Sequence, residues 1–216
     1  MCGLAGFLSL QPMRAEQAEA ELRNMARAIA HRGPDAEGLW YELAAGVALC
    51  HRRLSVIDLS PLGAQPMRSA SGRFVIVFNG EIYNYRDLRL DLQAQGCTFR
   101  GASDTEVLLA GIETWGLEST LRSCRGMFAF ALWDTHERAL YLARDRFGEK
   151  PLYYGESGGC FLFGSELKAL RAHSACHPDI NRDALTLLLR HYYIPAPHSI
   201  YRGVFKASPG CIVRVR

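Results

Sequence analysis

The cysteine at position 2 has the clearest potential for chemistry in this sequence. A thiol attacks as its thiolate, and only roughly a few per cent of a free cysteine is ionised at neutral pH, so the nucleophile needs a base. If an aminopeptidase removes Met1, Cys2 carries a free α-amino group with a pKa of about 7.7–8.0. This amine could accept the thiol proton directly or through one water. Taken alone, chance explains one cysteine near a terminus more simply, because chain ends tolerate change.

The elements that must position this cysteine begin with a predicted strand over residues 3–10. An amphipathic helix is expected at 15–31, where apolar residues recur on one face and Gly33-Pro34 ends the pattern. Asn84, a Ser103–Glu106 capping box and Asn181 are expected to begin three more helices. The further predicted strands cover residues 38–43, 46–54, 73–79, 127–134, 139–145, 151–156 and 160–165.

The order of these elements indicates the fold class. Strands and helices come in runs rather than in βαβ alternation, which favours an α+β fold over a doubly wound parallel sheet. Residues 127–134 and 139–145 are almost continuously apolar. Strands of this kind are covered on both faces, so we expect two packed sheets with helices outside. The run Arg144-Asp145-Arg146 is expected to form a structural ion-pair cluster.

Composition excludes several classes of protein. The chain has 216 residues and a net charge of +3, which is too weak and dispersed to favour nucleic-acid binding. Its seven cysteines occur singly, so the sequence predicts neither a zinc site nor a disulfide framework. The apolar stretch at the N-terminus is too short for a signal peptide, and no window is long enough to cross a membrane. We therefore expect a cytoplasmic location.

Eight segments resemble, in order, the glutaminase domain of asparagine synthetases, a branch of the class II glutamine amidotransferases, which are N-terminal-nucleophile hydrolases. The segments are MCGLAGF, HRGPD (31–35), HRRLSVIDLSPLGAQPM (51–67), FNGEIYNY (78–85), SDTEVLL (103–109), RGMFAFALWD (125–134), ARDRFGEKPLYY (143–154) and FGSELKAL (163–170). The resemblance implies a four-layer αββα sandwich of two mainly antiparallel sheets flanked by helices. It also implies hydrolysis of glutamine to glutamate and ammonia through a γ-glutamyl thioester on Cys2.

Catalytic roles follow from the same resemblance. Attack on an amide creates a tetrahedral oxyanion, which needs hydrogen-bond donors already aimed at it. Asn79 and Gly80 match the family's oxyanion pair, through the Asn79 side-chain N–H and the Gly80 backbone N–H. Without the resemblance, Asn-Gly is the strongest signal of a hairpin turn. With it, we expect such a turn to present the two donors.

Substrate-binding roles also follow. Arg53 matches the arginine that holds the α-carboxylate of glutamine, and Arg52 is its rival because adjacent strand positions face opposite ways. Asp104 matches the acid that binds the α-ammonium, although an aspartate in a first helical turn is also favoured without a ligand. Backbone groups of a further set match the remaining glutamine contacts: Leu54, Ser55, Val56, Ile57, Asn79, Gly80 and Glu81.

The resemblance also sets expectations about domains and partners. Residues 1–216 are expected to form one type-2 glutamine amidotransferase domain, with about 172–216 as the bridge toward a synthetase domain that these residues do not contain. That other domain would use ATP and Mg²⁺, whereas no cofactor or metal is expected here. The expected partners are free glutamine and the synthetase domain, without nucleic acid or membrane, and a homodimer stays open.

Three alternatives remain at this stage. The domain could bind glutamine or a partner without turnover. It could be a Cys/His hydrolase of another class, with an internal cysteine and a histidine such as His51 as base. It could also be another amidotransferase or N-terminal-nucleophile amidase that acts on a different amide.

Overall fold

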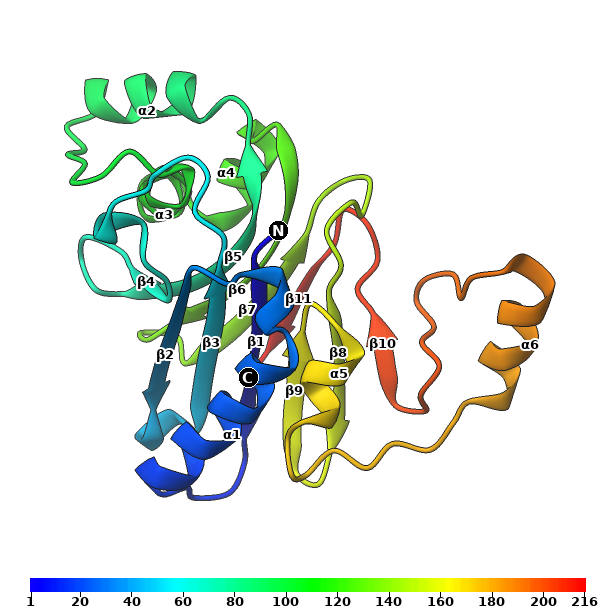
Figure 1. Cartoon of the computed structure of the whole chain (residues 1–216). Coiled ribbons are helices and arrows are strands. Elements are labelled where there is room, and N and C mark those ends of the chain that lie inside the picture. The colour runs from blue at the N-terminus through cyan, green and yellow to red at the C-terminus, as the bar shows by residue number, and fades with distance from the viewer.

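Two antiparallel sheets form the middle of the molecule in a computed structural model that describes residues 1–216 (Figure 1). The six-stranded sheet has the order β10-β8-β9-β1-β3-β2, and the five-stranded sheet has the order β11-β7-β6-β5-β4. The strands of the first sheet are β1 (Gly3–Ser9), β2 (Ala36–Glu42), β3 (Val47–Arg53), β8 (Tyr153–Ser157), β9 (Cys160–Gly164) and β10 (Val204–Lys206). Those of the second are β4 (Met67–Arg68), β5 (Phe74–Ile82), β6 (Gly126–Asp134), β7 (Ala139–Arg144) and β11 (Ile212–Val215).

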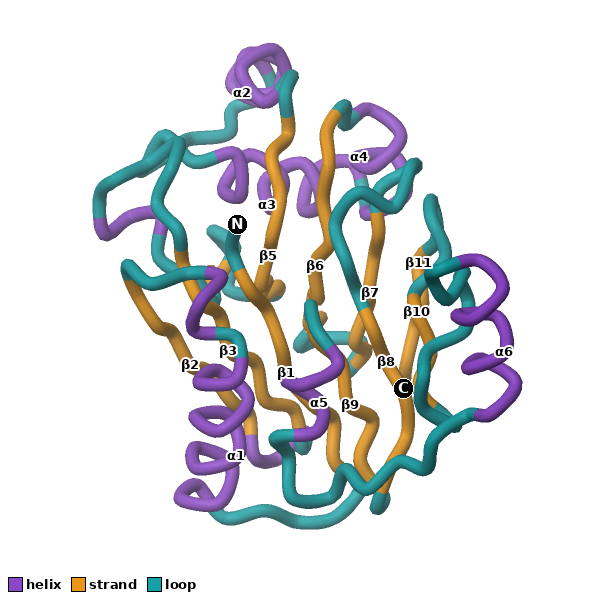
Figure 2. Tube along the Cα trace, turned by 45° about the vertical axis from the view of Figure 1, so that its right-hand side comes forward, coloured by secondary structure: helices purple, strands orange, loops and turns teal.

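Helices cover the outer face of each sheet (Figure 2). The six-stranded sheet carries α1 (Ala15–Ala28), the 3₁₀ turn η1 (Ala30–Arg32) and α5 (Leu167–Arg171). The five-stranded sheet carries α2 (Tyr85–Ala94), α3 (Asp104–Trp115) and α4 (Leu117–Ser123). Two further 3₁₀ turns are η2 (Leu43–Ala45) and η3 (Pro61–Gly63).

Three apolar cores separate the four layers. Leu49, Val77 and Ala131 belong to the core between the two sheets. A second core joins α1 to the six-stranded sheet, and a third joins α2 and α3 to the five-stranded sheet. Each central strand is apolar on both faces because one face meets the other sheet and the other face meets helices. The predicted αββα sandwich is therefore confirmed.

Most long elements begin and end near their predicted bounds, but three local predictions are wrong. Asn79 and Gly80 lie inside β5, opposite Ala129 and Phe128 of β6, and not in a turn. Asn84 precedes α2, yet its side chain makes no cap and bonds instead to the backbone of Ser123 and Arg125.

The third concerns Arg144, Asp145 and Arg146. These side chains form no ion pair with one another. Arg144 and Arg146 donate to backbone carbonyls, and Asp145 accepts four backbone N–H groups, of Phe128, Phe147, Glu149 and Lys150. The cluster is structural, as expected, but the partners of its charges are peptide groups.

The segment before β10 forms an arm that extends from the sandwich (Figure 1). It carries α6 (Arg182–His191), whose N-cap Asn181 accepts from the N–H groups of Asp183 and Ala184 as predicted. Ala184 is the only buried residue of α6, while Leu189 is 74% exposed and Tyr192, just after the helix, is 93% exposed. Part of the apolar surface of this helix is therefore exposed to solvent.

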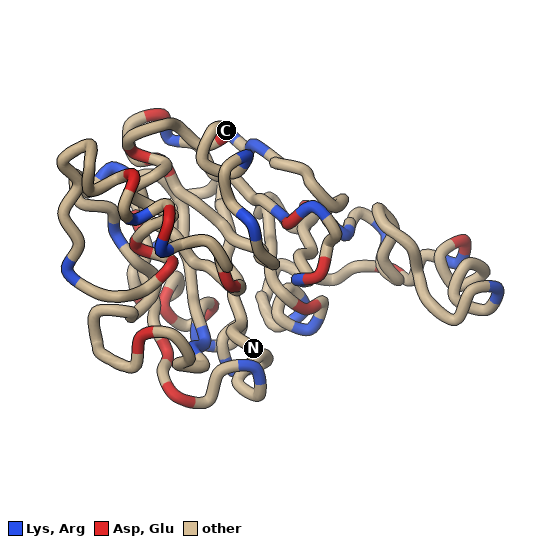
Figure 3. The backbone as a smooth tube through the Cα atoms, turned by 90° about the horizontal axis from the view of Figure 1, so that it is seen from above, with Lys and Arg blue, Asp and Glu red and all other residues tan.

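Two further observations concern the whole molecule. No helix combines the length and the apolar character that a bilayer crossing requires. Basic and acidic residues are interspersed along the backbone, so neither sign dominates the view in Figure 3.

Candidate active site

The open edge of β5 is the feature around which the candidate site is built. On one side β5 pairs with β6 along its whole length. On its other side β4 pairs only with Val75 and Ile76. From Phe78 onward, the backbone groups on this side have no neighbouring strand, and buried backbone groups need other partners.

Side chains supply those partners at Phe78 and Ile82. The Phe78 N–H donates to Gln65 Oε1 at 2.6 Å, and the Phe78 carbonyl accepts from His51 Nε2 at 2.9 Å. Four residues further on, the Ile82 N–H donates to Asp104 Oδ2 at 2.9 Å. Side chains therefore supply hydrogen-bond partners to the β5 backbone on both sides of Gly80.

Gly80 itself directs its N–H to this open edge. Its partner in β6 is Phe128, whose own N–H donates to Asp145 Oδ2 and whose carbonyl accepts the Asp145 N–H at 2.8 Å. Phe128 therefore points its polar groups away from β5, and the Gly80–Phe128 pair is a non-hydrogen-bonded one. A side chain could not fit here, because a Cβ on Gly80 would lie 2.4 Å from the Met127 carbonyl oxygen.

Asn79 provides a second donor without a partner. Its side chain is buried, and its Nδ2 atom makes no hydrogen bond. Buried polar groups are rarely left unpaired, and an orphan of this kind points to a functional role or a missing ligand. Asn79 and Gly80 both line one cavity.

The cavity has a volume of about 210 Å³ and brings together residues from six separate segments of the chain. Nine of the ten residues predicted from the sequence line it: Cys2, Arg53, Leu54, Val56, Ile57, Asn79, Gly80, Glu81 and Asp104. Ser55 lies outside the lining, and its backbone N–H donates to Asp35 Oδ2 at 2.8 Å.

Cys2 stands at the start of β1, with its sulfur at the cavity. The Sγ atom lies 3.4 Å from the Leu54 backbone nitrogen and 3.5 Å from the Leu54 carbonyl oxygen. Burial raises the pKa of the Cys2 thiol, and the Leu54 N–H and nearby positive charges offset this only in part. The thiol is therefore not ionised by its surroundings and requires a base.

Arg32 holds Cys2 in place, a role that the sequence did not reveal. Its Nε atom donates to the Cys2 carbonyl at 2.9 Å, and its Nη1 atom pairs with Glu166 at 2.9 Å. The sequence indicated only that the HRGPD motif matches the family and that its Gly33-Pro34 ends the preceding helix. Other lining residues that the sequence did not indicate include Gln65, Thr105, Met127 and Lys150.

Arg53 faces the cavity and Arg52 faces away from it, as strand alternation requires. Arg53 donates to the carbonyls of Asp58 and Ser60, in the loop that follows β3. Arg52 instead donates to the Gly33 carbonyl at 3.0 Å and pairs with Glu37 at 2.9 Å. Of the two arginines, only Arg53 can meet a ligand in the cavity.

Asp104 lies in the first turn of α3, where Ser103 caps the helix by accepting the Glu106 N–H at 3.2 Å. Its carboxylate is buried at the cavity wall, and burial raises the pKa of Asp104 to about 6 even though the Ile82 N–H favours the ionised form. A cationic group bound in the cavity would lie near the Asp104 carboxylate, which has no cationic partner in the protein.

His51 does not lie next to a nucleophile. Its Nε2 atom bonds the Phe78 carbonyl, its Nδ1 atom has no partner, and burial lowers the pKa of the imidazole to about 4. No cysteine of the chain hydrogen-bonds to a histidine: the only cysteine side-chain bonds are Cys2 with Leu54 and Cys97 with Thr114. The geometry therefore argues against a Cys/His dyad with His51 as base.

Comparison with known proteins gives a consistent result. A family model described as "Glutamine amidotransferase domain" matches residues 1–216. The chain is 40% identical over 232 residues to a putative asparagine synthetase [glutamine-hydrolyzing] of Mycobacterium tuberculosis (strain ATCC 25618 / H37Rv), a match that covers 100% of this chain and 35% of that protein. It is 39% identical to asparagine synthetase [glutamine-hydrolyzing] 1 of Bacillus subtilis, with 100% and 34% covered, and 41% identical to amidase chry2 of Gibberella zeae, with 97% and 32% covered.

A solved structure shares the fold at low sequence identity. Glutamine phosphoribosylpyrophosphate amidotransferase from B. subtilis superimposes with a TM-score of 0.66 and 21% identity, over 83% of this chain and 45% of that one. The chain spans about a third of the length of the curated relatives it matches.

Proposed function

This chain belongs to the glutamine amidotransferase domain family, and from that premise we propose that its cavity hydrolyses free glutamine with Cys2 as the nucleophile. The observation that carries the proposal is the convergence of three groups on one cavity. These are the Cys2 sulfur, the unpartnered Asn79 side-chain amide and the edge-directed N–H of Gly80.

In the proposed first step, the Cys2 sulfur attacks the side-chain amide carbon of glutamine. After removal of Met1, the α-amino group of Cys2 accepts the thiol proton, since burial raises the pKa of the thiol and it cannot ionise unaided. The Asn79 Nδ2–H and Gly80 N–H donate to the oxyanion that forms on the amide oxygen. The protonated amine then donates to the departing nitrogen, so ammonia leaves and a γ-glutamyl thioester remains.

The second step reverses these proton transfers. A water molecule gives a proton to the same α-amino group and attacks the thioester carbon. The oxyanion returns to the same two donors and then collapses. The Cys2 sulfur leaves and regains its proton, and glutamate is released. Apart from the attacking water, every group in both steps belongs to this chain or to glutamine.

Two charged side chains orient the substrate in this proposal. The Arg53 guanidinium lies on one side of the cavity and suits the α-carboxylate, which an arginine can bind through two N–H groups. Asp104 is buried on another side and suits the α-ammonium, whose charge would favour the ionised carboxylate. Backbone groups of Leu54 to Ile57, including Ser55, and of Glu81 provide the remaining contacts.

Replacement of Cys2 by alanine tests this proposal directly. Glutamate release from glutamine, measured by mass spectrometry on protein whose mass shows that Met1 is gone, should fall to background in Cys2→Ala. A second preparation that retains an uncleaved N-terminal tag should also be inactive, because it keeps the sulfur but lacks a free α-amino group on Cys2. Activity that survives either change would refute the assignment of nucleophile or base.

We further propose that the ammonia passes to an ATP- and Mg²⁺-dependent synthetase domain of the parent protein, with about residues 172–216 as the bridge. The names of the curated relatives support asparagine as the product, although one is called an amidase. The exposed apolar residues of the α6 arm support a partner at this surface. The free state of all seven cysteines supports a reducing, cytoplasmic setting.

The bridge can be tested with the rest of the B. subtilis relative supplied as a separate chain. Leu189→Asp together with Tyr192→Asp should abolish glutamine-dependent synthesis. The same pair should leave glutaminase activity and ammonia-dependent synthesis intact. Unchanged glutamine-dependent synthesis would show that this face is not the bridge.

A further inference from the structure

His51 makes a polar contact between the two sheets, inside a core that is otherwise apolar. It belongs to β3 of the six-stranded sheet and lies two residues beyond Leu49, so both side chains point toward the other sheet. Its Nε2 atom crosses the core to the carbonyl of Phe78 in β5, at 2.9 Å. This bond joins the sheet that contains Cys2 to the sheet that contains Asn79 and Gly80.

The strand that carries His51 is also the strand that holds Cys2. Arg52, the next residue of β3, pairs with Gly3 in β1, directly after Cys2. The Phe78 carbonyl in turn belongs to the peptide group that leads into Asn79, and a peptide group is planar. The register places Cys2 opposite Arg53, so His51 is two residues from the position of the nucleophile, and it bonds the peptide group that leads into the oxyanion donor Asn79.

Gln65 binds the other backbone group of Phe78 at the same open edge. Its Oε1 atom accepts the Phe78 N–H at 2.6 Å, and its Nε2 atom lies 3.4 Å from Thr105 Oγ1 in α3. The Phe78 N–H and carbonyl are thus both hydrogen-bonded to side chains from different parts of the chain. These bonds replace the strand that β5 lacks at this point.

The protonation state of His51 suits such a role. A carbonyl only accepts hydrogen bonds, so Nε2 must carry the hydrogen, and Nδ1 is left as an unpartnered lone pair in the core. Burial keeps the imidazole neutral because it lowers the pKa to about 4. A neutral donor forms a fixed link between the sheets without placing a charge in the core.

We propose that His51 is a positioning residue for the oxyanion hole. Its bond to the Phe78 carbonyl sets the Asn79 and Gly80 donors relative to the Cys2 sulfur, and Gln65 holds the Phe78 N–H. The inference rests on the proposed glutaminase activity. Because the oxyanion exists only during reaction, displaced donors lower kcat and leave glutamine binding largely unchanged.

Two substitutions of His51 separate positioning from general stability. His51→Leu keeps an apolar side chain of moderate size but has no donor, whereas His51→Gln retains a side-chain N–H. Activity is expressed per Cys2 that reacts with a glutamine-like electrophile, counted by intact mass, so that misfolded molecules do not enter the rate. His51→Leu should lower this kcat about 10- to 100-fold with KM within about twofold, as expected for weakened oxyanion stabilisation. His51→Gln should recover most of the loss.

Gln65 supplies a test that does not depend on the folding of the His51 variants. Gln65→Leu removes the acceptor of the Phe78 N–H and should lower kcat, whereas Gln65→Glu keeps an acceptor oxygen and should lower it less. Ser69→Ala is the matched control, since Ser69 Oγ accepts the Phe74 N–H of the same strand at the other end. Wild-type kcat per reactive Cys2 in Gln65→Leu, or in His51→Leu, would overturn the proposal, as would equal losses in His51→Leu and His51→Gln.

Failure of the proposed glutaminase function gives a different experimental result from failure of the positioning role. If the wild-type protein releases no glutamate, the glutaminase assignment is wrong, and amide hydrogen exchange then decides the positioning role alone. Faster exchange of the Asn79 N–H in His51→Leu than in the wild type would support the link between the sheets. Unchanged exchange would overturn it.

Discussion

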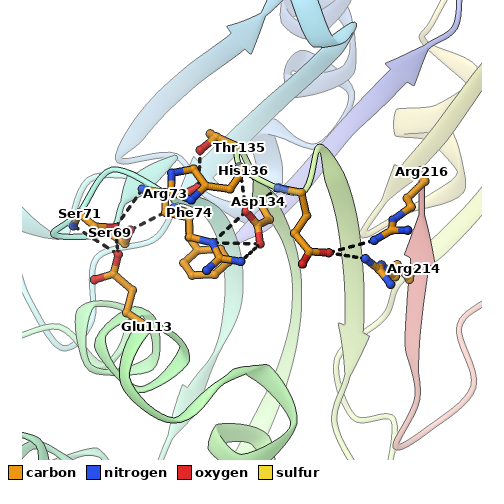
Figure 4. A network of polar contacts seen from close by, with 11 residues as sticks. Ser69, Ser71, Arg73, Phe74, Glu113, Asp134, Thr135, His136, Arg214 and Arg216 are labelled. Atoms are coloured by element: carbon orange, nitrogen blue, oxygen red, sulfur yellow. Dashed lines mark hydrogen bonds and ion pairs between the residues drawn. The ribbon is translucent and has the colours of Figure 1, made fainter.

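At its first residues β5 has a strand on both sides, whereas from Phe78 onward it has β6 on one side only. At the paired end, a network of polar contacts surrounds Asp134 (Figure 4). Asp134 is buried and accepts from Arg73 Nη2 at 2.6 Å and from the His136 N–H at 2.9 Å. Nearby, Ser69 Oγ accepts the Phe74 N–H.

At the open end, side chains satisfy the backbone only in part. Phe78 and Ile82 have partners, but the Gly80 N–H and the Asn79 amide do not. The same strand therefore has one end whose polar groups bond within a network, and another end with two donors that have no partner in the protein. This difference predicts that substitutions at the two ends will affect different measurements.

The largest effect is expected at the open end, for Asn79→Ala. Removal of one oxyanion donor typically lowers kcat about 100- to 1,000-fold, because the lost bond forms only with the tetrahedral intermediate. KM for glutamine should stay close to the wild-type value. Steady-state glutamate release per reactive Cys2 measures both constants, and a rise in KM without a fall in kcat would assign Asn79 to substrate binding instead.

Asp104→Asn should act on binding instead of turnover. Removal of the charged partner of a buried ammonium should raise KM for glutamine by about 100-fold at pH 8. Because burial raises the pKa of Asp104 to about 6, the wild-type carboxylate becomes protonated as pH falls through 6 and loses its attraction for the ammonium. The wild-type kcat/KM should therefore have an inflection near pH 6 that Asp104→Asn lacks. An inflection in both proteins would trace it to another group.

Asp134→Asn tests whether the paired end of β5 contributes to stability alone. It replaces a buried, multiply bonded carboxylate with a neutral group, so the free energy of unfolding should fall by about 2 kcal/mol. Asp134 does not line the cavity, so kcat and KM should be unchanged below the unfolding transition. Chemical denaturation and steady-state kinetics on the same sample provide the two readings. A selective loss of kcat would show that the two ends are coupled.

Ser69→Ala should give the smallest effect. It leaves the buried Phe74 N–H without an acceptor, which costs about 1 kcal/mol of unfolding free energy. The matched change at the open end, Gln65→Leu, removes the same kind of bond but should also lower kcat. Identical behaviour of the two variants would mean that the ends of β5 do not differ in function.

The sequence predicted the long elements because each has a periodic or continuous apolar pattern that its neighbours in the fold require. β6 and β7 are examples, since they are buried on both faces as their apolar runs indicate. The short elements β4, β10, α4 and α5 were not predicted. Their few residues have little pattern of their own, and contacts with longer elements determine them.

The candidate site was predicted through recurring motifs, and what the motifs could not supply was tertiary contact. Asn79-Gly80 resembles a turn locally, but pairing with β6 makes it part of a strand. Gln65 and Arg32 act through partners 13 and 30 residues away, so no local pattern indicates their contacts with Phe78 and Cys2. His51 was singled out as a rival base, whereas the structure places it in a contact between the sheets.

The seven free cysteines differ in burial, and this has a practical consequence for labelling chemistry. Burial raises the pKa of Cys50 and of Cys124 to about 12, so alkylating reagents that need a thiolate will leave both unmodified while the fold is intact. Cys211 is exposed, so it will compete with Cys2 for any such reagent. A Cys211→Ser background would therefore make covalent capture a cleaner report on Cys2, and loss of protection at Cys50 would signal that the two sheets have separated.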